Sequence, residues 1–117
     1  MTTPVLLRIV CAAEAATGLA LLVDPPTVIG LLLGSDITGA GLVISRIAGI
    51  ALIALAVACW PGGGARALQG MVLYNLGVAT YMAVVGLGGG PVGVLWWPAC
   101  AAHAVLAVLL VRALLKK

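Results

Sequence analysis

At 117 residues the chain has the length of one domain, and 64% of its residues are hydrophobic while only 8% are charged. This composition excludes an ordinary soluble protein, because soluble domains carry about 25% charged residues. The net charge of +3 comes from cations scattered along the chain and not gathered on one face, which argues against nucleic-acid binding.

Four apolar segments approach the length of about 20 residues that spans the hydrocarbon core of a bilayer. We therefore predict an all-α integral membrane protein, a bundle of four transmembrane helices with a short interfacial helix between the first two. One membrane domain would occupy residues 1–117. The predicted spans are 4–23, 36–60, 65–87 and 91–115.

The first span has a clear start and a clear end. Thr3 can cap its free amides, and Pro4 occupies a first-turn position where a missing N–H costs nothing. The Asp-Pro-Pro sequence at 24–26 ends it, because proline cannot continue a helix. Glu14 in its middle argues against a cleaved signal peptide, so we expect this segment to remain as a span.

Residues 27–34 are apolar but too short to cross a bilayer, which predicts an interfacial helix at the mouth of the bundle. The second span then carries Gly41, Ser45 and Gly49 at four-residue spacing. Such a stripe of small residues lets a neighbouring helix approach closely, so we predict a packing face there.

Glycine-rich turns precede and follow the third span. Gly70, Tyr74, Gly77 and Tyr81 form one stripe along this helix, and Asn75 lies on the adjacent stripe. Both stripes are compatible with helix packing. In the fourth span, Pro98 predicts a bend, because an interior proline removes a backbone hydrogen bond.

The cysteines indicate neither disulfides nor a metal centre. Cys11, Cys59 and Cys100 are odd in number, lie in different apolar segments and show no CxxC spacing. Free cysteines of this kind are usually small buried residues. We therefore predict no metal site.

One polar residue lies near the middle of each predicted span. Counting about 1.5 Å of rise per residue brings all four to a similar depth. Arg46 is the most costly of them in lipid, and Glu14 is the expected partner because it is the only acid within an apolar segment. The predicted cluster consists of Glu14, Arg46, Asn75 and His103, with Tyr74 and Tyr81 satisfying the remaining donors and acceptors.

The chemistry of this cluster stays open. A Glu14–Arg46 pair could fix helix register or serve a function. His103 could be a hydrogen-bonded core histidine, a titrating group or a ligand, but a haem is not expected, because the chain has no second histidine. No arrangement of residues indicates a catalytic site, so an enzyme is not the favoured class.

The cations predict the orientation. Four spans place the two termini and the turn between the second and third spans on one side, and that side holds Arg8, Arg66, Arg112, Lys116 and Lys117. The other side holds Asp24 and Asp36. By the positive-inside rule, both termini would be cytoplasmic in a bacterial inner membrane.

The first half of the chain resembles the small DoxX-like four-helix bacterial membrane proteins. The matching features are Arg8, Gly18, the Asp-Pro-Pro break and the Arg-Ile-Ala-Gly sequence at 46–49. This resemblance implies a four-helix bundle that can be associated with redox or quinone-linked membrane complexes.

The chain is also similar in length and span number to the small multidrug resistance transporters, whose first-helix glutamate would correspond to Glu14. It departs from them in carrying Arg46 and a strong charge asymmetry.

These observations give two functional expectations. The first is a non-catalytic accessory subunit that binds a lipid or quinone and associates with membrane lipids, with copies of itself or with a larger membrane complex. The alternative is a proton-coupled transporter that acts as a dimer through Glu14 and His103.

Overall fold

The computed structural model describes residues 1–116, and within them it contains five helices and no strand. These are α1 (Thr3–Val23), α2 (Pro25–Leu33), α3 (Ala40–Ala58), α4 (Gly64–Leu87) and α5 (Trp96–Leu115). All but α2 are long and apolar enough to cross a membrane, as predicted. Large apolar side chains also point outwards, including those of Ile44, Leu73 and Val105, which is typical of helices that face lipid.

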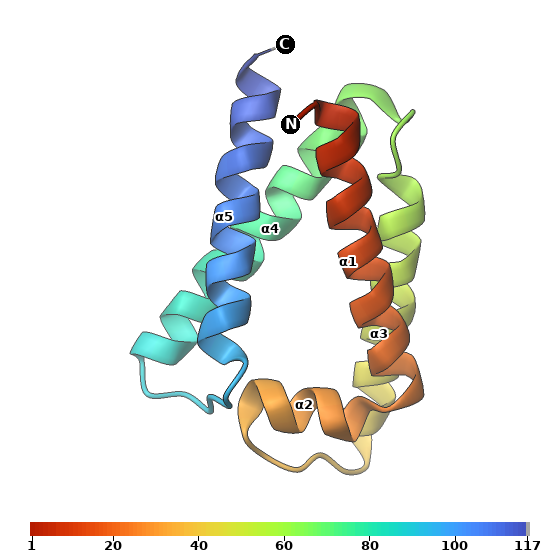
Figure 1. Cartoon of the computed structure of the whole chain (residues 1–117). Coiled ribbons are helices and arrows are strands. Elements are labelled where there is room, and N and C mark those ends of the chain that lie inside the picture. The colour runs from red at the N-terminus through yellow and green to blue at the C-terminus, as the bar shows by residue number, and fades with distance from the viewer. Residues whose placement is uncertain (117) are drawn as a thin grey trace.

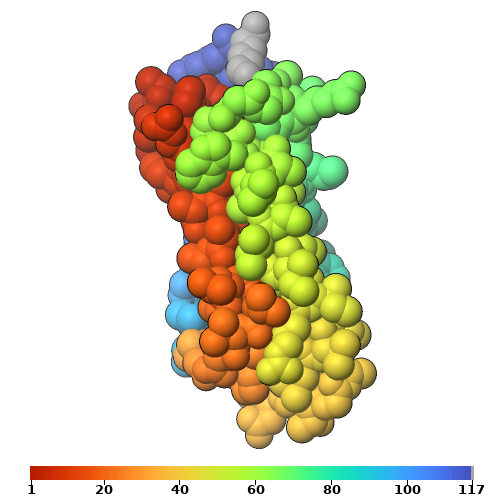
Figure 2. Space-filling model, turned by 90° about the vertical axis from the view of Figure 1, so that its right-hand side faces the viewer, coloured from red at the N-terminus to blue at the C-terminus, as the bar shows by residue number. Residues whose placement is uncertain are grey.

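The spanning helices form two pairs. Helix α1 packs along α3, and α4 packs along α5 (Figure 1). Figure 2 shows the first pair from the side, with α1 and α3 in close contact along their length. The pairs converge at the end that holds both termini, where Leu7 and Val10 of α1 share a core with Leu68 of α4 and Leu110 of α5. At the other end they diverge, and α2 lies across the opening.

The crossing of α1 and α3 depends on two glycines. A methyl group placed on Gly49 would lie 2.5 Å from the carbonyl oxygen of Gly18, and one placed on Gly18 would lie 2.6 Å from that of Gly49. Ser45, one turn away, is also buried. The two backbones are therefore in direct contact at a point where no larger residue fits.

Not every residue of the predicted packing stripes takes part in helix packing. Gly41 has only Ile37 as a neighbour, and Gly77 faces open space. Gly70 does pack, since a methyl group there would lie 3.3 Å from the sulfur of Cys59. The prediction is thus wrong for Gly41 and Gly77, because four-residue spacing identifies a face but not whether a neighbour covers it.

Helix α2 connects the two pairs. The Asp24 carboxylate accepts a hydrogen bond from the Thr27 amide at 3.4 Å at its N-terminus. At its C-terminus the Gly93 N–H donates to the Leu32 carbonyl at 2.7 Å, and the Leu95 N–H donates to the Leu31 carbonyl at 2.9 Å. Carbonyls that a helix end leaves without partners are thereby satisfied by the segment that leads into α5.

Two helices begin later than predicted. Helix α3 starts at Ala40 and not at 36, following Gly39, whose φ of 53° lies outside the helical region. Helix α5 starts at Trp96 and not at 91, because the preceding residues pair with α2. Pro98 is consequently in the first turn of α5, where its missing N–H has no intrahelical partner to lose, so the premise of the predicted bend is wrong.

All three cysteines are free and buried, as predicted for small core residues. Arg66 near the start of α4 and Arg112 near the end of α5 lie at the end of the molecule that holds both termini. Lys117, another cation predicted for that side, lies outside the described residues.

Candidate functional site: a cavity between the helix pairs

A cavity of about 560 Å³ lies where the two helix pairs diverge. All five helices contribute to its wall, which is almost entirely apolar. Its side chains capable of hydrogen bonding are those of Thr17, Tyr74, Trp96 and His103. A volume of about 300–1,000 Å³ with a few polar groups is usual for a small-molecule site, so this cavity is the candidate functional site.

Behind the cavity wall, hydrogen bonds link three helices. The Tyr74 hydroxyl of α4 donates to the Glu14 carboxylate of α1 at 2.9 Å. The His103 ring of α5 lies edge-on to the Tyr74 ring with centroids 5.7 Å apart, and its Nδ1 is 2.9 Å from Oδ1 of Asn75. The structure thus brings together Glu14, Tyr74, Asn75 and His103, four of the six residues of the predicted cluster.

Asn75 and Glu14 are held deep inside the protein. Asn75 is fully buried, and its Nδ2 donates to the Met71 carbonyl one turn earlier at 3.0 Å. Glu14 is 4% exposed, and among the described residues Tyr74 supplies the only hydrogen bond to its carboxylate. Buried polar groups need such partners, because an unsatisfied one costs about 1–3 kcal/mol.

Arg46 does not belong to this cluster, which corrects the prediction of a Glu14–Arg46 pair. Its side chain is exposed, and its Nε donates to the Leu22 carbonyl at 3.3 Å. Leu22 lies in the last turn of α1, where free carbonyls and the helix dipole favour a cation. The depth count failed because α3 begins at Ala40, which leaves Arg46 only about 9 Å from the helix end.

Tyr81 also lies outside the cluster. Its side chain is 69% exposed, on the outer surface of α4. Tyr74, two turns earlier on the same predicted stripe, is the tyrosine that reaches Glu14. The stripe alone could not distinguish the two, because α1 is near α4 only towards the end that holds the termini.

Substitution of Arg46 by methionine should lower the free energy of unfolding by less than about 1 kcal/mol, because it removes one exposed hydrogen bond to a helix terminus. Denaturant unfolding in detergent measures this change. A loss of about 3–5 kcal/mol, the cost of breaking a buried ion pair, would instead support the Glu14–Arg46 pair.

Substitution of Tyr74 by phenylalanine should have a larger effect, of about 1–2 kcal/mol, because it leaves the buried Glu14 carboxylate without a donor. The matched control is Tyr81→Phe, which removes the same hydroxyl from an exposed position and should leave the free energy of unfolding unchanged. Equal effects of the two variants in the same unfolding assay would contradict the assigned role of Tyr74.

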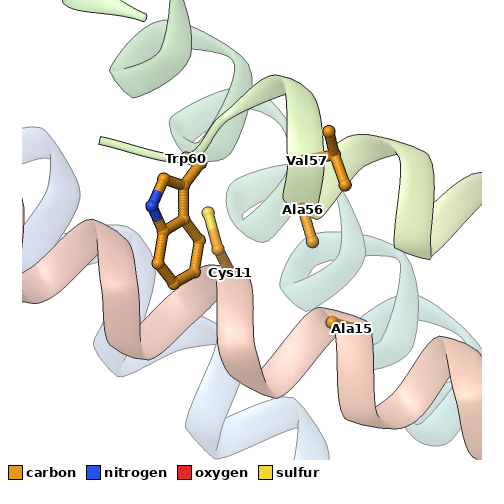
Figure 3. Close-up of a pocket in the computed structure, with 5 residues that line it drawn as sticks. All are labelled: Cys11, Ala15, Ala56, Val57 and Trp60. Atoms are coloured by element: carbon orange, nitrogen blue, oxygen red, sulfur yellow. The ribbon is translucent and has the colours of Figure 1, made fainter. Parts of the chain in front are cut away.

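A smaller hollow of about 350 Å³ lies between α1 and α3 (Figure 3). There the indole of Trp60 lies beside Cys11, and Ala15, Ala56 and Val57 complete the wall. This hollow contains neither a charged side chain nor a buried hydrogen-bonded network. The larger cavity, which has both polar groups and enclosure by five helices, is therefore the better candidate.

Within residues 1–116, no group of three or more His, Cys, Asp or Glu side chains could hold a metal ion. The cluster instead presents the hydrogen-bonding groups of Tyr74 and His103 to an apolar space, and a second protonatable side chain, Glu14, lies behind Tyr74. Comparison with protein-family models, with curated proteins and with solved structures finds no match.

Sequence reasoning missed the cavity itself, two of its polar or aromatic side chains and the role of α2 in its wall. Thr17 and Trp96 were not predicted as site residues, and α2 was expected only as an interfacial element. The apolar surface of α2 was a usable signal, because a short helix with Leu31 and Leu32 next to a glycine stop needs an apolar surface to cover.

Proposed function

We propose that this protein is a non-catalytic membrane subunit that binds one lipid-like or quinone-type molecule in the cavity between its helix pairs. The polar end of the ligand would lie against Tyr74 and His103, and its apolar part would occupy the space between α1, α2 and α5. The observation that carries this proposal is an apolar cavity of about 560 Å³ whose wall includes the adjacent side chains of Tyr74 and His103.

The distribution of polarity favours an amphiphile over a water-soluble ligand. A charged or highly polar molecule would leave most of its hydrogen bonds unmade against walls such as Leu21, Leu52 and Val78. A molecule with a small polar head and an apolar body would match both parts of the wall. The resemblance to DoxX-like proteins agrees with this proposal.

The experiment is purification in mild detergent followed by mass spectrometry of the intact protein and of its extracted lipids. We expect one apolar molecule to be retained in near-stoichiometric amount. Ala99→Phe should abolish retention, because residue 99 lines the cavity. Ala102→Phe on the exposed side of the same helix is the matched control and should retain the ligand. Wild-type protein that carries no such molecule, and takes none up from lipid extracts, would refute the proposal.

Proton-coupled transport is the second candidate, and one observation favours it. A proton-coupled site requires a carboxylate that is free to bind and release a proton. Because Arg46 lies away from Glu14, no described cation neutralises this buried carboxylate. A dimer using Glu14 and His103 would then move its substrate through the space between the pairs. Uptake into proteoliposomes should be abolished by Glu14→Gln, and uptake that is insensitive to this change would remove the candidate.

We further propose that the protein resides in a bacterial inner membrane with both termini in the cytoplasm, either as a homo-oligomer or within a larger membrane complex. The cations near the shared end of the termini support this orientation. Alkaline phosphatase should be inactive when fused after the C-terminus and active when inserted at residues 35–38. The opposite pattern would reverse the orientation.

A further inference from the structure

The side chains of the cavity wall have already used their hydrogen-bond donors. The Thr17 hydroxyl donates to the Ala13 carbonyl at 2.9 Å, and the Tyr74 hydroxyl donates to Glu14 at 2.9 Å. The Trp96 indole N–H donates to the Met82 carbonyl at 3.1 Å. What Thr17 and Tyr74 can still offer to the cavity is the oxygen lone pairs of their hydroxyls.

The hydrogen bond to Asn75 determines which ring nitrogen of His103 carries the proton. Because Asn75 Nδ2 donates to the Met71 carbonyl, its Oδ1 is the atom that faces His103 and can only accept. The His103 Nδ1 must therefore carry the proton and donate it. In the neutral ring, which is far less costly to bury than the cation, Nε2 is then an acceptor.

The acceptor at Nε2 is accessible. Among the described residues, every polar side-chain atom that is fully buried has a hydrogen-bond partner. The hydrogen bond of His103 is made through Nδ1, so Nε2 must be open, and the cavity is the space that this ring lines. The polar part of the cavity thus presents lone pairs from Thr17, Tyr74 and His103 with no matching side-chain donor.

We infer that the cavity selects an apolar molecule whose head group donates a hydrogen bond, a hydroquinone or an isoprenoid alcohol, over the corresponding quinone or ether. This inference rests on the proposed function and names the class of its ligand. A hydroxyl can donate to His103 Nε2 or to the Tyr74 oxygen. A quinone carbonyl would meet only lone pairs and would lose its hydrogen bonds on entering the cavity.

Reorienting Tyr74 or His103 to donate to a quinone would break a hydrogen bond that each of them makes inside the protein. If the Tyr74 hydroxyl turned towards a quinone, the buried Glu14 carboxylate would lose its donor. If His103 moved its proton to Nε2, its Nδ1 lone pair would face the Asn75 oxygen. Each change replaces a hydrogen bond with a buried polar group that has no partner, which is unfavourable.

The test compares ligand pairs on the wild-type protein in detergent by equilibrium dialysis. The first pair is a hydroquinone with a short isoprenoid tail, kept reduced under anaerobic conditions, and its quinone. The second pair is farnesol and its methyl ether, which separates a lipid alcohol from a hydroquinone as the source of the donor. We expect the donating member of at least one pair to bind about tenfold more tightly, the effect of one buried hydrogen bond.

Two variants test whether His103 and Thr17 cause the preference for a head group that donates a hydrogen bond. His103→Leu should reduce the difference within each pair to about threefold or less while the quinone and the ether bind as before. Thr17→Val should reduce it less, and Thr80→Val is the matched control, because Thr80 makes the same bond to a carbonyl one turn earlier but lies outside the cavity. Its preference should equal that of the wild type.

The outcomes separate this inference from the proposed function. If the donating member binds no more tightly than its counterpart in both pairs, the inference is wrong while the proposed binding function stands. If no compound binds, the proposed function fails as well. A preference that persists unchanged in His103→Leu would overturn the role assigned to His103.

Discussion

Gly49→Ala is expected to destabilise the protein by about 3 kcal/mol or more, the upper range for overpacking, because the added methyl group has no space at the crossing of α1 and α3. It would lie 2.5 Å from the Gly18 carbonyl oxygen and 3.0 Å from the Leu22 amide nitrogen. Backbone atoms cannot move aside as a flexible side chain can. The two helices must therefore separate and lose packing along their shared face.

Thermal unfolding in detergent, followed by circular dichroism or by accessibility of the buried cysteines, measures this effect. Gly18→Ala should behave in the same way, since its methyl group would meet the Gly49 carbonyl oxygen at 2.6 Å. Gly77→Ala is the matched control, because residue 77 is also within a spanning helix but faces open space. Alanine is intrinsically the better helix former by about 1 kcal/mol, so the control should be neutral or slightly stabilising. Equal stability of all three variants would mean that the close approach is absent.

Part of this fold follows directly from the sequence. Spanning helices are specified by local apolar length, so four of them were predictable, as was the small-residue face that contains Ser45 and Gly49. The partner of that face was not predictable from spacing, because Gly18 is distant in the sequence and only the tertiary arrangement brings its backbone to Gly49. Local patterns identify which surfaces can pack but not which surfaces meet.

The candidate site shows the same division. Counting residues from helix ends placed Glu14, Asn75 and His103 at a common depth. In the structure Tyr74 contacts Glu14 and His103, and His103 in turn is hydrogen-bonded to Asn75. The same count failed for Arg46, because the helix began four residues later than assumed and a carbonyl at the end of α1 was available as its partner. The cavity was beyond sequence reasoning, since it depends on how far the two helix pairs diverge.

Hydrogen bonds between α2 and residues 93–95 connect the two helix pairs at the end where they diverge. Gly93→Ala should break them, because a methyl group there would collide with the Leu31 carbonyl oxygen and would lie 2.7 Å from the Gly34 amide nitrogen. The backbone of Gly93 does not lie in the left-handed region, so crowding alone produces the effect. We expect the hydrogen bonds of Gly93 and Leu95 to open and the cavity to lose its α2 wall.

Hydrogen exchange measured by mass spectrometry would detect this opening as faster exchange, by about a hundredfold, in peptides that cover residues 93–96, with little change in α1 and α3. If the cavity holds an apolar ligand, its retention should fall in the same variant, because Leu31 and Leu32 line the wall that would move away. Gly30→Ala is the control, since residue 30 lies in α2 with no neighbour near its added methyl group. Unchanged exchange in Gly93→Ala would show that α2 is held over the cavity by other contacts. The ligand class inferred from Tyr74 and His103 would be unaffected by that result, because neither residue belongs to α2.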